Sequence, residues 1–515
     1  MFQRSAILCR IMRALLVPSL ALTLSLAGAP ASQAQTGNDG AGSVSLVKLS
    51  TDTFTNTRSQ HATEVEPDTF SFGSTIVAAF QVGRFTDGGS SDIGFATSVD
   101  GGGAWTNGFL PGITNIQGVG NPYDRDSDPA VAYDPLHGVW IIASLPIVDS
   151  GKSIPAVIVS RSTDGINWDN PVSVGGNVAS SDKDWIVCDS WPASPHYGNC
   201  YVEWDNPANG DQINMSTSTD GGITWSAALH PSGSAFGLGG QPVVQPNGNV
   251  VVPFDGNGIQ TFTSTDGGST WGKVITISSQ IDHAEAGDLR NIGLPVAAVD
   301  GGGTVYVAWQ DCRFRTRCAE NDIVLSTSTD GTTWTAPARV PEDPVTSSID
   351  HFLPGLDADK TTSGSGAHLA LIYYTYAQSS CTQSTCTMGV SFISSADGGA
   401  TWGKPVALTR TPMKLTWLPN TTSGLMVGDY FSVSYVNGKA FGVFAVAQAK
   451  VGSTFNEAMY TTPFGLGTPE GATFSSADDK PIPGAKSDHG LRREQEERGP
   501  KAAPPAKRVK RAARK

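Results

Sequence analysis

The sequence predicts an all-β fold built from repeated units, and its composition and patterning support this. Gly and Pro are abundant, at 59 and 32 residues, and only 16% of the residues are charged. Short apolar runs separated by turn residues dominate, and no long stretch has helical periodicity. The chain is also longer than one hydrophobic core of about 250–300 residues supports, which favours a repeat architecture.

One turn motif recurs six times: Ser, Asp two positions later, then Gly, then Trp. The copies span residues 98–105, 162–168, 218–225, 264–271, 328–334 and 395–402. In a tight hairpin the Asp carboxylate and Ser hydroxyl can accept hydrogen bonds from backbone N–H groups, and Gly supplies a positive φ. The Trp begins the next strand and can pack against the neighbouring sheet. The motif therefore predicts a strand connection and not a catalytic group.

This motif resembles the Asp box, S-x-D-x-G-x-T-W, the repeat of the sialidase (neuraminidase) superfamily, and the likeness covers roughly residues 44–467. The resemblance implies a β-propeller of four-stranded antiparallel blades, with each Asp box joining the third and fourth strands away from the ligand face. It also implies a secreted, glycan-directed protein. Sialidases bind the substrate carboxylate with three arginines, and they use a Tyr–Glu pair as nucleophile and an Asp as acid/base.

The blade count follows from the strand plan before each box. Six units end in a box, and a seventh unit over residues 429–462 lacks one. Its missing outer strand can come from residues 44–49, ahead of the first unit, and this would close the ring and remove exposed sheet edges. We therefore favour seven blades closed by an N-terminal strand, with the six blades of sialidases as the alternative.

The first sialidase arginine lies in an F-R-I-P-type motif, and its position here is occupied by Val65, between Glu64 and Glu66. A second family pattern, A-F-x-x-x-R, is matched at residues 79–84, so one arginine, Arg84, carries over. Acids at the channel mouth would repel an anionic sialic acid where the family places cations. The sequence therefore leaves sialidase activity open.

Candidate site residues come from the face opposite the boxes, where inner strands begin and second strands end. The candidate catalytic residues are Glu66, Asp128, Asp184, Asp429 and Tyr430, and the candidate substrate-binding residues are Arg84, Arg313, Trp185 and His351. Two carboxylates across a sugar can act as acid and base, or as acid and nucleophile, and aromatic side chains can stack on sugar rings. A structural reading competes, in which each acid bonds the neighbouring blade's backbone and Arg313 pairs with Asp311.

Three functions remain open at this point. The first is a glycoside hydrolase acting through the carboxylates at the channel mouth. The second is a non-catalytic propeller that binds glycan or protein at the cell surface, and the third is a lyase or other enzyme using a Tyr, His and Arg set. No cofactor is predicted, although Asp124, Asp126 and Asp128 alternate in a way that could hold Ca²⁺, without the Gly and Glu of an EF-hand loop.

The charge pattern bears on partners. The net charge is -13, yet the segment from residue 492 to the end holds ten Lys or Arg against three Glu, so the body of the chain is strongly acidic. An acidic body argues against a nucleic-acid partner. Residues 468–515 are expected to form a disordered basic tail, which either solubilises the chain or tethers it to an anionic envelope polymer.

The N-terminus has the pattern of a secretory signal peptide. Arg4, Arg10 and Arg13 precede an apolar run over residues 14–27 and a small-residue cleavage region ending at Ala34. The run is shorter than the ~20 residues of a spanning helix, so we expect cleavage after residues 1–34, a linker over 35–43, no transmembrane segment, and an extracellular or periplasmic location.

Cys9 would leave with the signal peptide, so six cysteines would remain in an oxidising compartment. They lie in three close pairs, which are Cys188 with Cys200, Cys312 with Cys318, and Cys381 with Cys386. Local pairing is the simplest of the fifteen connectivities that six cysteines allow. No pair has the C-x-x-C spacing typical of a metal site.

Overall fold

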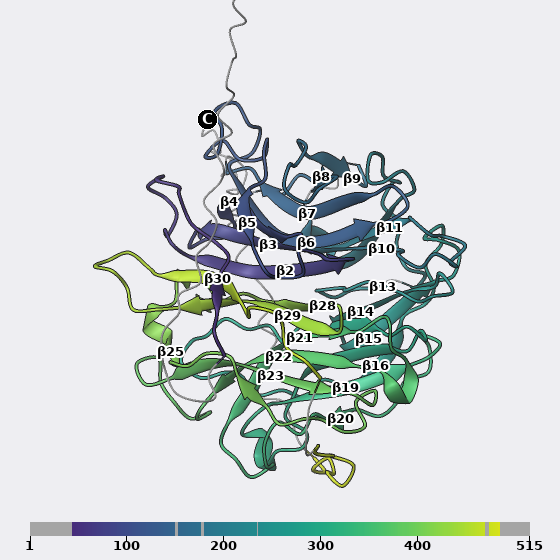
Figure 1. The fold of residues 1–515 in the computed structure, drawn as a ribbon, viewed down its shortest axis with the longest axis vertical. Coiled ribbons are helices and arrows are strands. Elements are labelled where there is room, and N and C mark those ends of the chain that lie inside the picture. Colours follow the sequence, from purple (N-terminus) through teal and green to yellow (C-terminus); the bar gives the residue numbers. More distant parts are fainter. Residues whose placement is uncertain (1–43, 150–152, 177–179, 234, 469–472, 485–515) are drawn as a thin grey trace, which may run out of the picture. The chain divides into compact units, whose positions relative to one another are not determined.

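A computed structural model describes residues 44–149, 153–176, 180–233, 235–468 and 473–484. The expected signal peptide (1–34) and linker (35–43) lie outside the described residues. The described part is an all-β propeller in which nearly all regular structure is antiparallel strand (Figure 1). Among the described residues, no helix reaches the length and apolarity that crossing a bilayer requires.

The first eight strands after the N-terminal one form a single sheet with two parts. Its first part is β2 (Glu64–Phe72), β3 (Thr75–Arg84), β4 (Ser90–Ser98) and β5 (Thr106–Phe109). Its second part is β6 (Arg125–Asp134), β7 (Val139–Ile147), β8 (Val157–Ser162) and β9 (Val172–Val174). The two parts are joined through one residue pair, Ser90 with Asp126.

Five separate sheets of three to five strands follow. The first is β10 (Asp182–Cys188), β11 (Cys200–Asn206) and β12 (Gln212–Ser218), and the second is β13 (Val243–Val244), β14 (Val250–Gly256), β15 (Gly258–Ser264) and β16 (Ile275–Ser278). The third is β17 (Val296–Val299), β18 (Val305–Asp311), β19 (Asp322–Ser328) and β20 (Ala338–Arg339). The fourth is β21 (Asp350–Ala358), β22 (Leu369–Tyr376), β23 (Thr387–Ser395), β24 (Val406–Ala407) and β25 (Met413–Lys414). The fifth is β28 (Ser432–Val436), β29 (Lys439–Ala447), β30 (Glu457–Thr461) and β1 (Val47–Lys48).

Short elements complete the described chain. A two-stranded hairpin consists of β26 (Asn420–Thr421) and β27 (Gly424–Leu425). The 3₁₀ turns are η1 (Pro207–Asn209), η2 (Thr316–Cys318), η3 (Gly364–Gly366) and η4 (Leu415–Trp417).

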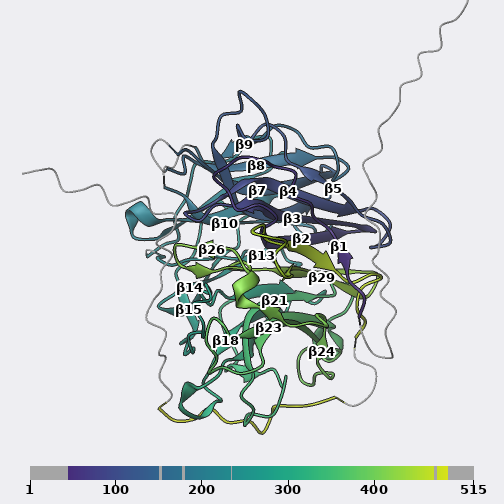
Figure 2. The ribbon, with the colours of Figure 1, turned by 90° about the vertical axis from the view of Figure 1, so that its left-hand side faces the viewer.

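The innermost strands surround a channel. Each of β2, β6, β10, β13, β17, β21 and β28 contacts the next in that order, and β28 contacts β2. The closing pair is formed as predicted, because β1 runs antiparallel to β30, with Val47 opposite Thr461. Figure 2 shows β1 close to β29, the strand on the other side of β30. The backbone N–H of Leu49 also donates to the carbonyl of Met459 at 2.8 Å. The N-terminal strand therefore supplies the outer strand that the last unit lacks.

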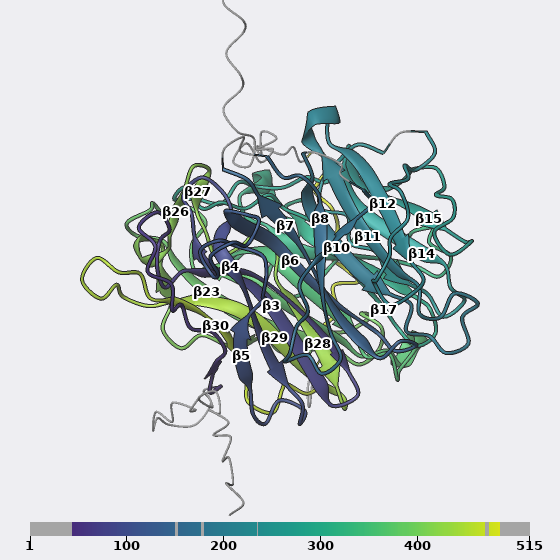
Figure 3. The same cartoon turned by 90° about the horizontal axis from the view of Figure 1, so that it is seen from above.

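The expected count of seven separate blades, or six, is not what the strand pairing gives. Five sheets stand as separate blades of mostly four strands, and the first two four-stranded units share one eight-stranded sheet. Figure 3 shows β3, β4, β6 and β7 of this shared sheet next to one another. The cause is local, because Ser90, the first residue of β4, pairs with Asp126 of the next inner strand. The Ser90 hydroxyl also donates to the Asp126 carbonyl at 2.8 Å.

The six repeated turns have the hydrogen bonding that their sequence predicts. In the fourth copy, the Asp266 carboxylate accepts from the backbone N–H of Thr270 at 2.9 Å and from its hydroxyl at 2.6 Å. The hydroxyl of Ser264 donates to Asp266 at 2.9 Å and accepts from the N–H of Gly268 at 2.9 Å. The Trp of the motif packs across blades, as where the Trp271 ring lies 6.2 Å from that of Tyr201 in the preceding sheet.

We predict that Asp266→Ala lowers the free energy of unfolding by about 1 kcal/mol, because backbone N–H groups lose their acceptor in the turn. Urea denaturation followed by tryptophan fluorescence measures the change. Asp169→Ala, at an exposed Asp outside the turns, should stay within about 0.5 kcal/mol of the parent. Equal effects of the two substitutions would show that the turn carboxylate does not stabilise the blade.

All three local disulfides are formed as expected: Cys188–Cys200, Cys312–Cys318 and Cys381–Cys386. Cys188 and Cys200 are direct cross-strand partners in β10 and β11. The other two bridges close loops, with sequence separations of 6 and 5 residues.

The expectation of a disordered tail from residue 468 is wrong for residues 473–484. Phe474 exchanges two backbone hydrogen bonds with Trp402, at 2.9 and 2.7 Å. Asp479 forms an ion pair with Arg339 at 3.4 Å, and the N–H of Ile482 donates to the Arg313 carbonyl at 2.8 Å. This segment therefore packs along the outer side of the propeller, and the rest of the basic tail lies outside the described residues.

Candidate functional site

Four inner strands begin with the same backbone irregularity. In each, the register shifts near the strand start, and one residue that is not glycine has a positive φ: Glu66 (54°), Asp128 (51°), Lys183 (33°) and Leu353 (51°). Such a conformation costs about 1–3 kcal/mol per residue and persists only where the surroundings enforce it, as at functional sites. Three of these four residues carry charged side chains.

Glu66 and Asp128 are connected through one amide. The Gln81 side chain on β3 donates through Nε2 to the Glu66 carboxylate and to the Ser127 hydroxyl, the latter at 3.1 Å. The Ser127 hydroxyl donates in turn to Asp128 at 2.6 Å. Arg84 donates to the other end of the same amide, Gln81 Oε1, at 3.0 Å. The bulges of β2 and β6 thus place two carboxylates on one polar network.

A third carboxylate, Asp429, acts electrostatically on Glu66 and comes from a distant part of the chain. Arg290 Nε donates to both oxygens of Asp429, at 2.9 and 3.0 Å, and Nη2 donates to Oδ2. Both side chains are at most 3% exposed. A buried pair of this kind fixes the position of the carboxylate, because separating the two charges in a dry environment is costly.

Tyr430, next to Asp429, packs against the third bulge. The Lys183 ammonium lies 3.7 Å from the centroid of the Tyr430 ring and 4.6 Å from that of Trp185, and the two rings are 5.2 Å apart. The Tyr430 hydroxyl donates to the carbonyl of Pro129 at 3.0 Å. These contacts are typical cation–π geometry and hold the lysine beside the carboxylates.

The electrostatics of this cluster favour a carboxylic acid at Glu66. Burial raises the pKa of Glu66 well above its ordinary value, Asp128 and Asp429 raise it further, and Arg84 and Arg290 oppose them. Burial likewise raises the pKa of Asp184, with Asp128 among the acids that add to the shift. A carboxyl with a raised pKa next to a carboxylate that an arginine binds is typical of acid–base sites.

The structure therefore brings together most of the predicted residues, namely Glu66, Asp128, Asp184, Asp429, Tyr430, Arg84 and Trp185. The five candidate catalytic side chains are only 0–3% exposed, so the expectation that they line an open channel mouth is wrong. The cause is the segment before β28, in which the carbonyl of Val427 accepts from the N–H of Glu66 and Gly428 lies against the Glu66 backbone.

Two predicted binding residues lie outside this cluster. Arg313 binds Asp311 with Nε at 2.8 Å and Nη2 at 2.6 Å, which matches the structural alternative for this residue. His351 is buried, and its Nδ1 lies 3.1 Å from the carbonyl of Asn321. The contacts of Arg313 and His351 hold their own loops in place, and these two residues do not share a site with the carboxylate cluster.

The acids considered for Ca²⁺ each have their own partner. Asp124 accepts from Asn115 at 2.7 Å, Asp126 from Ser144 at 2.9 Å, and Asp128 from Ser127. Within the described residues, the group of acid and His side chains near enough to share an ion is instead Asp322, Glu342 and His351. That group does not fit a cation, because Arg315 and Arg339 already bind Asp322, at 2.5 and 2.8 Å.

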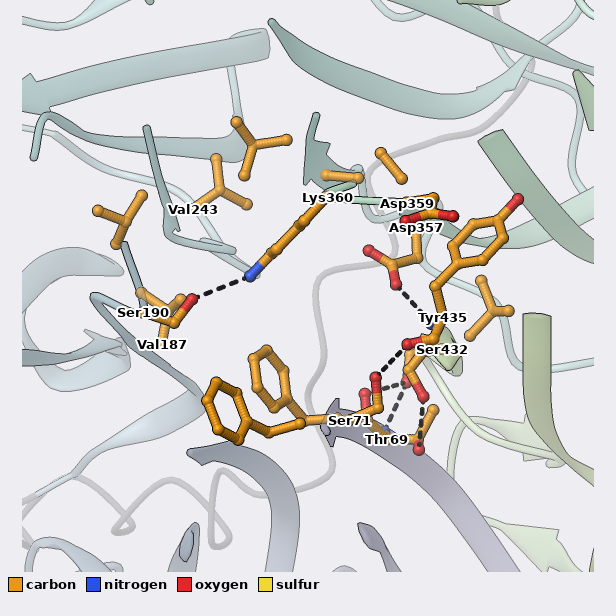
Figure 4. Close-up of a pocket in the computed structure, with 18 of the residues that line it drawn as sticks. Thr69, Ser71, Val187, Ser190, Val243, Asp357, Asp359, Lys360, Ser432 and Tyr435 are labelled. Atoms are coloured by element: carbon orange, nitrogen blue, oxygen red, sulfur yellow. Dashed lines mark hydrogen bonds between the residues drawn. The ribbon is translucent and has the colours of Figure 1, made fainter. Parts of the chain in front are cut away.

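A cavity of about 600 Å³ lies in the channel, lined by residues toward the ends of the inner strands, whereas the carboxylate cluster lies at their starts. Figure 4 shows this cavity with part of its lining. Asp68, Trp185 and Lys360 are among its lining residues, and Trp185 belongs both to this cavity and to the carboxylate cluster. Asp68 and Asp357 bond the neighbouring strands, accepting from the N–H groups of Val131 at 2.7 Å and Tyr435 at 3.0 Å. These two acids have the structural role considered for single carboxylates.

The buried acids predict how stability depends on pH. Burial raises the pKa of Glu64, Asp126 and Asp350 to about 8 each. The folded state thus binds these protons more tightly than the unfolded chain, where such groups titrate near pH 4. Their contribution to stability is full below pH about 4 and is lost as the pH rises through about 8.

We therefore expect the free energy of unfolding to fall between pH 5 and pH 9, as measured by urea denaturation at fixed ionic strength. A flat or rising profile over this range would contradict the buried, protonated state of these carboxyls.

Sequence reasoning missed Gln81 as the centre of the network, and it did not pair Arg290 with Asp429. Gln81 had a signal, since it is a polar residue within an apolar strand, between Phe80 and Val82. The ion pair had none, because its partners are 139 residues apart and meet only through folding.

Neither a family model nor a curated protein matches this sequence. Its structure is similar to that of a protein of unknown function from Dyadobacter fermentans, with 16% identity over 68% of this chain and 98% of the other and a TM-score of 0.43. It is also similar to the intramolecular trans-sialidase from Ruminococcus gnavus (11% identity, 75% and 90% coverage, TM-score 0.37) and to an ulvan lyase, a polysaccharide lyase (11% identity, 84% and 98% coverage, TM-score 0.47). These likenesses concern the arrangement of the backbone and assign no residue a role.

Proposed function

We propose that this protein is a secreted, glycan-directed β-propeller that hydrolyses a glycoside through the cluster of Glu66, Asp128 and Asp429. The observation that carries the proposal is the strained backbone at Glu66 and Asp128, which brings a carboxyl with a raised pKa next to further carboxylates. Strain and shifted protonation at the same place are typical of catalytic sites.

The proposed reaction needs one acid and one base. Glu66 gives its proton to the glycosidic oxygen as the bond from that oxygen to the anomeric carbon breaks. Asp128 takes a proton from the water whose oxygen bonds to the anomeric carbon, and the next proton exchange restores both groups. Asp429, fixed by Arg290, stabilises the positive charge that develops on the sugar ring. Trp185 offers a ring face for stacking, since it lies between the cluster and the channel cavity.

The test is a panel of fluorogenic glycosides, sialosides included, incubated with the purified protein. Release of the fluorophore that Asp429→Asn abolishes supports the proposal. The result that overturns it is the absence of turnover across the panel together with retention of the protein on a glycan array.

That second result is what the alternative expects, namely a propeller that binds glycan or protein at the cell surface without catalysis. The observation in its favour is the burial of the cluster and the full pairing of Asp429 with Arg290. Hydrolysis requires the Glu66 carboxyl to contact the bound glycan, whereas binding without catalysis does not.

Secretion, removal of residues 1–34 and tethering through the basic tail belong to the same proposal. The three disulfides support an oxidising compartment. Mass spectrometry of the protein from the culture medium would give the mature N-terminus, which we expect directly after Ala34 or within a few residues of it.

A further inference from the structure

The channel cavity contains a cation in an unusual position. Lys360 follows β21, and its side chain extends into the cavity toward Ser190, which follows β10 (Figure 4). In the ring of inner strands, β13 and β17 separate β10 from β21 on one side, and β28, β2 and β6 separate them on the other. Lys360 therefore reaches across the channel, and its Nζ donates to the Ser190 hydroxyl at 3.3 Å.

Aromatic rings flank this ammonium. The Nζ of Lys360 is 5.2 Å from the centroid of Phe70 on β2 and 5.5 Å from that of Trp191. Of the described residues that line the cavity, Lys360 is the one Lys or Arg. A planar apolar wall beside one cation and several hydroxyls is the chemistry that recognises a sugar ring carrying an acidic group.

The acids that line the cavity are hydrogen-bonded to the protein backbone, and two of them have raised pKa values. Asp68 and Asp357 bond the neighbouring backbone, and burial raises their pKa to about 6 and about 7. Asp359 accepts from the N–H and hydroxyl of Thr361 in its own loop. Protonation of Asp68 and Asp357 at mildly acidic pH therefore lowers the negative charge that lines the cavity. Asp357 and Asp189 are the acids that act electrostatically on the Lys360 ammonium.

We propose that this cavity is a second ligand site, distinct from the carboxylate cluster, which takes a sugar residue bearing a carboxylate. Lys360 binds the carboxylate, and Trp191 and Phe70 pack against the ring. The volume of about 600 Å³ lies within the range of small-molecule sites. From the proposed function this inference takes only the class of ligand, and its site needs no catalysis.

Isothermal titration calorimetry with D-glucuronate and D-glucose tests the proposal on the full chain, because these two sugars differ only in the carboxylate. We expect glucuronate to bind at least tenfold more tightly than glucose at pH 6, and more weakly at pH 8 than at pH 6. Lys360→Met should lower the glucuronate affinity at least tenfold, and Lys360→Arg should retain most of it. Lys404→Met, at an exposed lysine, should leave it unchanged.

The proposal would be overturned if glucose bound with the same affinity as glucuronate. It would also be overturned if the Lys360→Met variant bound glucuronate with the affinity of the parent protein. Glu66→Gln separates this inference from the proposed function, since it should lower turnover by about 10²–10⁴-fold and keep glucuronate binding. Loss of binding in Glu66→Gln would place the ligand in the cluster and would also overturn a second site. Circular dichroism of each variant establishes that it is folded.

Discussion

Glu66→Gln is expected to lower the rate of glycoside hydrolysis by about 10²–10⁴-fold, the range of a general acid. A glutamine at position 66 has nearly the same shape as glutamate, and its side-chain oxygen can still accept the hydrogen bond from Gln81. It has no carboxyl proton to donate beside Asp128 and Asp429. Initial rates on the substrate found by the glycoside panel, at saturating and limiting concentrations, measure the loss. Because Glu66 is argued to act in the transition state, kcat should fall more than KM changes.

Glu457→Gln provides the matched control. Glu457 is another glutamate that burial holds at a raised pKa, and it lies beside Glu64, on β30, the strand that pairs with β1. Its replacement should change kcat less than twofold. Similar losses in both variants would mean that Glu66 affects the fold and not the reaction, and unchanged kcat in Glu66→Gln would remove it from the mechanism.

Arg290→Met is expected to lower the free energy of unfolding by about 3–5 kcal/mol, because it leaves the Asp429 carboxylate buried without its cation. Urea denaturation measures this change as a shift of the midpoint at constant slope. The double variant Arg290→Met with Asp429→Leu should regain most of the loss, since it buries no charge.

Arg58→Met serves as the comparison for this second prediction. Arg58 pairs with Asp149 at the surface, where the arginine side chain is 60% exposed. Removing an exposed pair should cost at most about 1 kcal/mol. An Arg290→Met effect as small as that of Arg58→Met would show that Asp429 is hydrated or protonated in the folded protein.

The features of the fold that could be predicted from the sequence are those encoded locally. The turn at Ser264–Asp266 forms from residues within one short segment, so its hydrogen bonds follow from the motif. The disulfides also close short loops. Closure by the strand at Val47 was predictable because the last unit, over residues 429–462, had no outer strand, and the segment at residues 44–49 belonged to no other unit.

The features that could not be predicted depend on contacts between distant segments. The pair of Ser90 with Asp126, which merges two units into one sheet, leaves no mark in composition or spacing. Phe474 pairs with Trp402 although its surroundings are rich in Gly, Ser and Asp, as in a disordered tail.

The sequence indicated Glu66 and Asp128 of the cluster, but not the environment in which they lie. Strand starts indicated Glu66 and Asp128, because the strand plan places these positions on the channel. Their positive φ could not be predicted, since a residue before proline normally favours extended backbone. The burial of the cluster comes from Val427 and Gly428, whose path across the inner strands is a tertiary feature.

The most direct test of the central claim is the position of a bound substrate in a crystal of the Glu66→Gln variant. We predict the glycosidic oxygen within hydrogen-bond distance of the side chain at position 66, with Asp128 facing the anomeric carbon and a sugar ring against Trp185. Substrate bound elsewhere on the propeller, with the side chain at position 66 still covered by Val427 and Gly428, would contradict the assignment of catalysis to this cluster.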